Sequence, residues 1–247
     1  MAAGQLERVD EDELVVPGPA RVTDALIDAA RDLFDNWRLI AANLLWAFGL
    51  IALLAALSLW LPAAVLLGLL GLPAAGISYM AARIVRGQPT DLGHLVSGMR
   101  RHGGAGLLLG FGSIVAASVL AANALFGIEL GDFTGWPFIG FAFYGALALP
   151  MFLLAAWPLV VDPLRADQPL RRRLRLGAMV AIAQPGRVLA LSALVAIALF
   201  ASSLVPPLLL TVTIAYLSLV AARFALPAAD RLEDRATVLP PPEEDRR

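Results

Sequence analysis

The sequence predicts an all-α, polytopic membrane helix bundle with six transmembrane helices and cytoplasmic amphipathic helices. Of its 247 residues, 59% are hydrophobic and 16% are charged, whereas a soluble globular domain has about 45–50% apolar and about 25% charged residues. Residues 39–82 and 188–222 contain no ionisable side chain. Because a helix rises ~1.5 Å per residue and a bilayer core is ~30 Å thick, each run is long enough for two crossings.

The chain begins with an acidic segment and continues into an amphipathic one. Residues 1–20 contain nothing that would bury a core, so we expect them to be disordered. Residues 22–37 place apolar side chains on one helical face and aspartates on the rest. This helix either lies on the membrane surface or packs on the bundle, and the pattern leaves both open. The membrane domain is expected to cover residues 21–227.

The first apolar run divides into spans at 39–61 and 63–85, because Leu61-Pro62 interrupts it. Asn43 is a polar side chain inside the first span and is a candidate for a functional role in the membrane interior. Pro73 lies within the second span and lacks a backbone N–H, so it is a candidate kink. The alternative is a tolerated transmembrane proline without a special role.

Residues 91–102 predict a cytoplasmic amphipathic helix, which a glycine pair separates from a third span at 105–127. Both histidines of the chain, His94 and His102, lie in the loop helix without a second ligand at metal-binding spacing. We therefore expect both to be solvated. Asn123, inside the third span, is the second candidate polar residue of the membrane interior.

The third span also carries small residues that recur at helical spacing, beginning with Gly106 and Gly110. Such stripes let helix backbones approach closely in lipid. Packing within the chain is the favoured interpretation, and a homo-oligomer is possible but not favoured. A fourth span at 137–161 follows, in which Pro150 is the second candidate kink.

Residues 166–183 are half apolar, but four arginines argue against a span. Inserting each arginine at mid-bilayer would cost ~2.5–3.5 kcal/mol of free energy. The large apolar residues of the segment favour insertion by only ~0.3–0.6 kcal/mol each, which is too little to compensate. We predict a basic amphipathic helix on the cytoplasmic face, stopped at Pro185-Gly186. Its arginines either contact anionic lipid or only fix the topology. These residues are Arg171, Arg172, Arg173 and Arg175.

The second apolar run is too long for one crossing and should turn near Pro206-Pro207, which gives spans at about 187–204 and 206–225. The charged tail at 228–247 is expected to be disordered. With six spans, every arginine falls on the same side of the membrane, and the opposite loops hold none. By the positive-inside rule, this distribution predicts that both termini are cytoplasmic.

The chemistry that the sequence lacks excludes several function classes. There is no cysteine, and no phosphate-binding loop, zinc-protease motif or serine-hydrolase motif is present. We find no catalytic, cofactor-binding or metal-binding constellation and predict that the chain is not an enzyme and uses no cofactor. A net charge of −1 gives no nucleic-acid signature. Apart from Arg83, Arg187 and Arg223 near their cytoplasmic ends, the predicted spans contain no Asp, Glu, His, Lys or Arg, which weakens the case for an ion-coupled transporter.

Two stretches of the sequence are similar to the YesL family of bacterial integral membrane proteins. Residues 43–46 read N-L-L-W directly after an amphipathic helix, and residues 72–75 read L-P-A-A, followed by Tyr79 and Arg86-Gly87. The resemblance implies a multi-pass protein of the bacterial inner (plasma) membrane. Family members resemble companions of carbohydrate uptake systems.

Three functions follow as hypotheses from these observations. The first is a non-enzymatic accessory or partner of a transport system, with transporter subunits and the lipid bilayer as its partners. The second is a facilitator for a small neutral solute, with a pathway past Pro73 and Pro150. The third is a lipid-interacting membrane scaffold that uses the arginines of residues 166–183.

Overall fold

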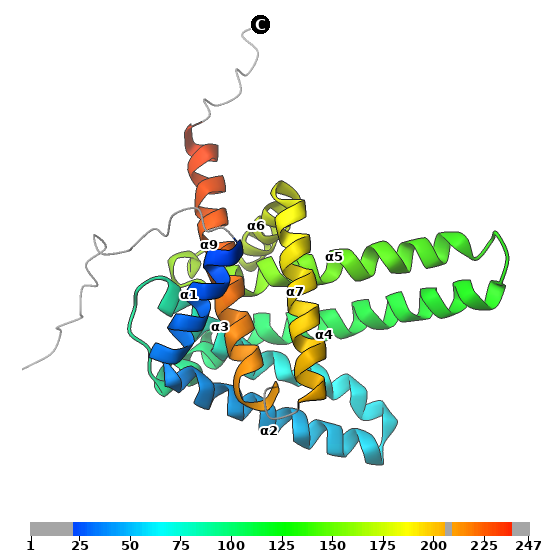
Figure 1. Ribbon diagram of the computed structural model, residues 1–247, viewed down its shortest axis with the longest axis horizontal. Helices are drawn as coiled ribbons and strands as arrows, with labels where there is room; N and C mark the ends of the chain where they lie inside the picture. Colours follow the sequence, from blue (N-terminus) through cyan, green and yellow to red (C-terminus); the bar gives the residue numbers. More distant parts are fainter. Residues whose placement is uncertain (1–21, 206–208, 239–247) are drawn as a thin grey trace, which may run out of the picture.

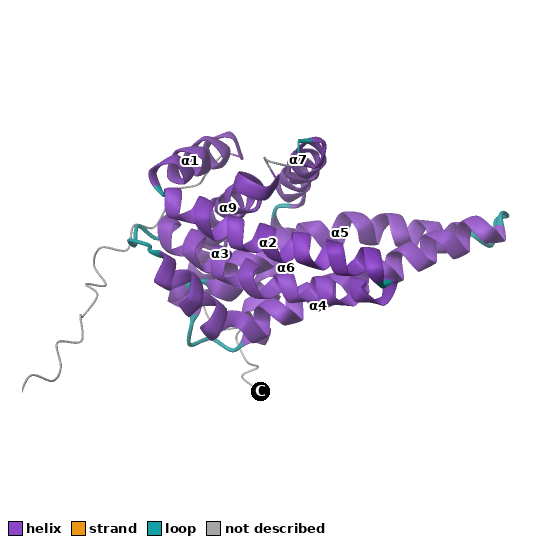
Figure 2. Cartoon of the chain, turned by 90° about the horizontal axis from the view of Figure 1, so that it is seen from below, coloured by secondary structure: helices purple, strands orange, loops and turns teal. Residues whose placement is uncertain are grey.

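The structure is a computed structural model that describes residues 22–205 and 209–238. Within these ranges every regular element is helical (Figures 1 and 2), which confirms the all-α prediction. The elements are α1 (Val22–Asp35), α2 (Trp37–Leu59), the 3-10 helix η2 (Leu61–Leu70), α3 (Gly71–Val85), α4 (Leu92–Leu130), α5 (Trp136–Val161), the short 3-10 helix η3 (Pro163–Arg165), α6 (Leu170–Ala183), α7 (Pro185–Leu204), the π-helix η4 (Leu209–Thr213) and α9 (Ile214–Val238).

In the described part of the chain, six helices are long and apolar enough to cross a membrane, so the chain is a multi-pass membrane protein. Two of the six form the centre of the bundle. The apolar windows of Val65–Val85 and Thr211–Asp234 are 56% and 67% buried inside the protein, against 17–22% for the other four. The outer helices therefore leave most of their apolar surface for lipid.

The helices do not all run parallel to one another. Figures 1 and 2 show α4 and α5 as a long antiparallel hairpin that reaches beyond the other helices. In Figure 1, α7 and α9 run across the base of this hairpin, and α1 lies beside α9. The centre is thus formed where α3, the end of α5 and the start of α9 meet.

A very close helix contact is made between glycines, where α3 and η2 cross α4. A Cβ atom on Gly71 would lie 2.2 Å from the carbonyl oxygen of Gly106, and one on Gly110 would lie 2.4 Å from that of Gly68. These backbones are close enough that only glycine fits at the crossing. The predicted small-residue stripe therefore packs within the chain at Gly106 and Gly110, and homo-oligomerisation stays untested.

The loop helix and the third span, predicted as separate at 91–102 and 105–127, form one helix. The 39 residues of α4 continue through Gly103 and Gly104 without a break. Asp91 caps its first turn, because its side chain accepts from the His94 N–H at 3.0 Å. Gly103 packs closely on Leu72, where an added Cβ would lie 2.7 Å from the leucine side chain. Packing thus outweighs the poor helix propensity of the glycine pair.

The C-terminal part of the chain requires a second correction. The tail was expected to be disordered from residue 228, but α9 continues to Val238. The helix extends because Asp230 and Glu233 form ion pairs with arginines of the bundle. The predicted N-terminal tail at 1–20, the prolines at 206–207 and residues 239–247 lie outside the described residues.

Smaller differences concern where helices begin. The second span starts as the 3-10 helix η2 and becomes α-helical only at Gly71, so Pro73 lies in the first turn of α3. The amphipathic helix expected at 166–183 begins at Leu170, after η3. That helix ends at Ala183, before Pro185 as expected, and Pro185 also opens α7 at a position where proline needs no backbone N–H.

Candidate functional site

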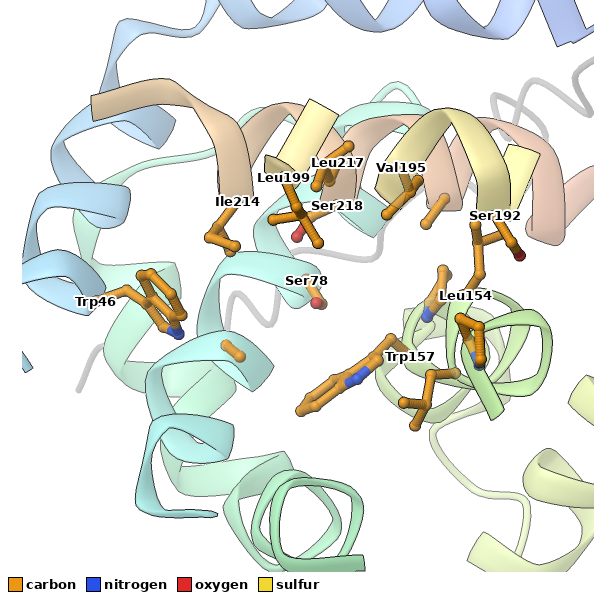
Figure 3. Close-up of a pocket in the computed structure, with 15 residues that line it drawn as sticks. Trp46, Ser78, Leu154, Trp157, Ser192, Val195, Leu199, Ile214, Leu217 and Ser218 are labelled. Atoms are coloured by element: carbon orange, nitrogen blue, oxygen red, sulfur yellow. The ribbon is translucent and has the colours of Figure 1, made fainter. Parts of the chain in front are cut away.

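The centre of the bundle contains an apolar cavity, partly open to the outside, with a volume of about 330 Å³. Figure 3 shows labelled side chains from α2, α3, α5, α7 and α9 surrounding this common space. The volume lies within the range of small-molecule sites, which is roughly 300–1,000 Å³. The cavity is lined by Trp46, Ala74, Ser78, Pro150, Leu153, Leu154, Trp157, Pro158, Ser192, Val195, Leu199, Ile214, Leu217, Ser218 and Ala221.

The lining is apolar except for three hydroxyl groups and two indole rings. Ser78, Ser192 and Ser218 come from three different helices, and Trp46 and Trp157 from two others. The Oγ atom of Ser192 is buried and has no hydrogen-bond partner in the described part of the chain. A buried hydroxyl without a partner costs free energy, which a bound molecule with one polar group would recover.

The two candidate kinks lie at different distances from this cavity. Pro150 lines it, as does Pro158 about two turns further along α5. Pro73 does not line it, although its neighbour Ala74 does. The sequence therefore pointed to the right helices, α3 and α5, but only Pro150 contributes to the surface of the cavity.

The two candidate asparagines have unequal roles. Asn43 is fully buried, and its Oδ1 accepts from the backbone N–H of Ala215 at 3.1 Å. Ala215 directly follows the η4–α9 junction, so Asn43 joins α2 to the point where the π-helix becomes α-helical. Asn123 instead donates to the carbonyl of Val119 at 2.8 Å within its own helix. Asn43 therefore supports the cavity wall beside Trp46, whereas Asn123 belongs to no site.

A buried cluster of charged residues lies beyond one end of the cavity. We call it the ion-pair cluster, and it comprises Arg86, Asp162, Arg165, Asp230 and Glu233. Arg86 donates to Asp162 at 2.8 Å and to Asp230 at 2.7 Å. Arg165 donates to Asp162, to Asp230 at 2.6 Å and to Glu233 at 2.6 Å. The cluster thus joins the ends of α3 and α5 to α9.

The ion-pair cluster continues the helices that line the cavity. Asp162 follows Pro158 by about one helical turn, and Arg86 follows Ser78 by about two. Burial alone would lower the pKa of Arg86, but its hydrogen bonds to Asp230 and Asp162 hold that pKa above the ordinary value. Both arginines therefore stay cationic and hold the three helix ends together.

The four arginines of α6, predicted as candidate lipid contacts, do not share one face. Arg171, Arg172 and Arg175 are exposed. Arg173 is only 9% exposed and donates from Nη1 to the carbonyl of Val160 at the end of α5. Burial lowers the pKa of Arg173, and the nearby charge of Arg101 lowers it further. The exposed three remain candidates for anionic lipid, and Arg173 faces the protein.

Sequence reasoning missed the ion-pair cluster and misplaced one histidine. Arg86 and Asp230 are 144 residues apart in the chain, so no local pattern connects them. A usable signal was present, because Arg86 and Asp162 stand directly at the ends of two predicted spans. His102 was expected to be solvated, but it is 4% exposed and its ring lies 5.3 Å from that of Tyr79.

The described residues contain no group of His, Cys, Asp and Glu side chains that could hold a metal ion. Comparisons of the chain with protein-family models, with curated proteins and with solved structures find no match. The similarity to the YesL family therefore stays a prediction that rests on residues 43–46 and 72–87.

Proposed function

We propose that the chain is a membrane facilitator that binds a small, uncharged and mainly apolar solute. The observation that carries this proposal is the cavity of about 330 Å³, partly open to the outside, that side chains of five helices line. An apolar cavity of only about 150 Å³ is enough to bind benzene. A molecule larger than one aromatic ring therefore fits the available space.

The chemistry of the lining selects the class of solute. No ionisable side chain lines the cavity, so a charged molecule would lose its hydration without gaining a counter-charge. The hydroxyls of Ser78, Ser192 and Ser218 offer hydrogen bonds to one or two polar groups. We infer a neutral ligand with an apolar body and a single hydroxyl, carbonyl or amide group.

Substituting Val195→Phe, on the cavity wall in α7, should weaken solute binding about tenfold or more. The added ring occupies space that the solute needs, and tenfold corresponds to ~1.4 kcal/mol of lost contact. The measurement is thermal unfolding of the protein in lipid nanodiscs with a panel of neutral one-ring and two-ring compounds, followed by titration of those that stabilise it.

The matched control is Ala196→Phe, because Ala196 is the next residue of α7, is exposed and does not line the cavity. The control should bind solutes as the wild type does. The proposal fails if no neutral solute stabilises the wild type, or if both variants lose binding equally.

A second function, an accessory subunit of a transport system, is supported by the shape of the protein. The α4–α5 hairpin reaches beyond the other helices (Figure 1) and exposes large apolar side chains, among them Phe126, Phe141 and Phe143. A carbohydrate uptake system is the partner that the family resemblance implies. Purification in mild detergent should then recover transporter subunits with the chain. Recovery of the chain alone would count against this function.

We further propose that the protein belongs to the bacterial cytoplasmic membrane with both termini in the cytoplasm. The ion-pair cluster supports the proposed orientation, because it requires the ends of α3 and α5 and the charged part of α9 to lie on the same side of the membrane. Arginines concentrate at that end, as the positive-inside rule expects for a cytoplasmic surface. A reporter fused after Arg247 checks the orientation.

A further inference from the structure

Arg173 is a buried cation without a counter-charge. It is 9% exposed, its Nε has no hydrogen-bond partner in the described part of the chain, and no described carboxylate lies within ion-pair distance of it. Asp162 acts on it electrostatically. That carboxylate is already shared by Arg86 and Arg165, however, and cannot also neutralise Arg173.

A second arginine, which adds positive charge, and a buried histidine lie near Arg173. Arg101 and His102, from the first part of α4, both interact electrostatically with it. His102 is 4% exposed, and its Nε2 is buried without a hydrogen-bond partner among the described residues.

The charge balance here is the reverse of that in the ion-pair cluster. The cluster sets three carboxylates against two arginines, so each arginine has more than one acceptor. Arg173 has instead one backbone carbonyl, that of Val160, as its acceptor, with the like charge of Arg101 nearby. The partial charge on a helix C-terminus offsets only part of a full positive charge. A buried, unneutralised cation is strongly unfavourable, so the arrangement calls for an anion.

We propose that Arg173, Arg101 and His102 form a phosphate-binding site between α4 and α6. A guanidinium presents several N–H donors in a planar fork that matches phosphate oxygens, and the free nitrogen of His102 adds a further polar contact. Arg101 is exposed, so one side of the site reaches the molecular surface. The phosphate comes either from the headgroup of an anionic phospholipid or from a free phosphate ion. This site is independent of the cavity and of any solute bound there.

The first experiment tests binding to the wild-type protein. Delipidated protein in detergent is titrated with phosphatidylglycerol, with phosphatidylcholine as the uncharged-headgroup comparison, and bound lipid is counted by native mass spectrometry. In parallel, thermal unfolding is followed in inorganic phosphate and in chloride at equal ionic strength. Preference for phosphatidylglycerol identifies a lipid headgroup, and stabilisation by phosphate identifies a free ion. If the wild type shows neither, the proposal is overturned.

The second experiment assigns the site to these residues. Arg173→Gln and Arg101→Gln should each weaken binding of the preferred probe about tenfold, because each removes a charge-assisted contact. Arg187→Gln changes an exposed arginine near the start of α7, outside both the proposed site and the candidate lipid contacts of α6. It is the control and should change affinity less than about twofold. Arg101 is exposed, so its variant provides the test even if Arg173→Gln does not fold. Equal losses in all three variants, or none in Arg101→Gln, would overturn the proposal.

Discussion

Replacing Arg86 by methionine should lower the free energy of unfolding by ~3–5 kcal/mol, because Asp162 and Asp230 then have to share Arg165 as their one remaining described arginine partner. Arg86 is 2% exposed and Asp162 is fully buried, so neither group is relieved by water. Methionine keeps much of the side-chain length while removing the charge. The measurement is the midpoint of thermal or denaturant unfolding in one detergent.

Two further variants separate the ion pair from general damage. Arg172→Met changes an exposed arginine and should leave the midpoint nearly unchanged. The double variant Arg86→Met with Asp162→Asn removes both partners of one pair, so it should recover part of the loss. If Arg86→Met unfolds at the same midpoint as Arg172→Met, the cluster does not hold the helix ends together.

The second large effect is expected at the glycine crossing. Gly106→Ala should destabilise the protein by ~1–3 kcal/mol, because the new methyl group would lie 2.4 Å from the carbonyl oxygen of Gly71. The two backbones must move apart to admit it, which also disturbs the neighbouring contact between Gly110 and Gly68. The same unfolding measurement gives the size of the effect.

The same helix provides a control substitution that should raise stability where Gly106→Ala lowers it. A Cβ added to Gly112 meets nothing within 4 Å, so Gly112→Ala relieves only the low helix propensity of glycine. That substitution should stabilise α4 by ~0.5–1 kcal/mol. Equal changes in both variants would show that propensity, and not close packing, governs these positions.

The fold class was predictable because it depends on composition averaged over long segments. The uncharged run at residues 39–82 requires two crossings whatever the details of packing. The joining of the loop helix to the third span was not predictable in the same way. It depends on the contact between Gly103 and Leu72, which belong to different helices. The extension of α9 likewise depends on partners of Asp230 that lie far away in the chain.

The candidate site was predictable only in part. Hydroxyls and prolines within the spans indicated the helices that line the cavity, and Pro150 lies on its surface. The inward position of Arg173 could have been deduced, because it shares a helical face with Leu176, Gly177 and Val180, all buried. The pairing of Arg86 with Asp162 and Asp230 could not have been deduced, because a single sequence does not show which distant charged residues are in contact.

The two ends of the cavity are held by different kinds of contact. At one end, ion pairs fasten α3, α5 and α9 together. At the other, α7 contacts the π-helix through a neutral hydroxyl pair, Ser202 with Thr213 at 2.8 Å. A solute of the proposed kind that entered between α7 and η4 would therefore separate this neutral pair and leave the ion pairs of the opposite end in place.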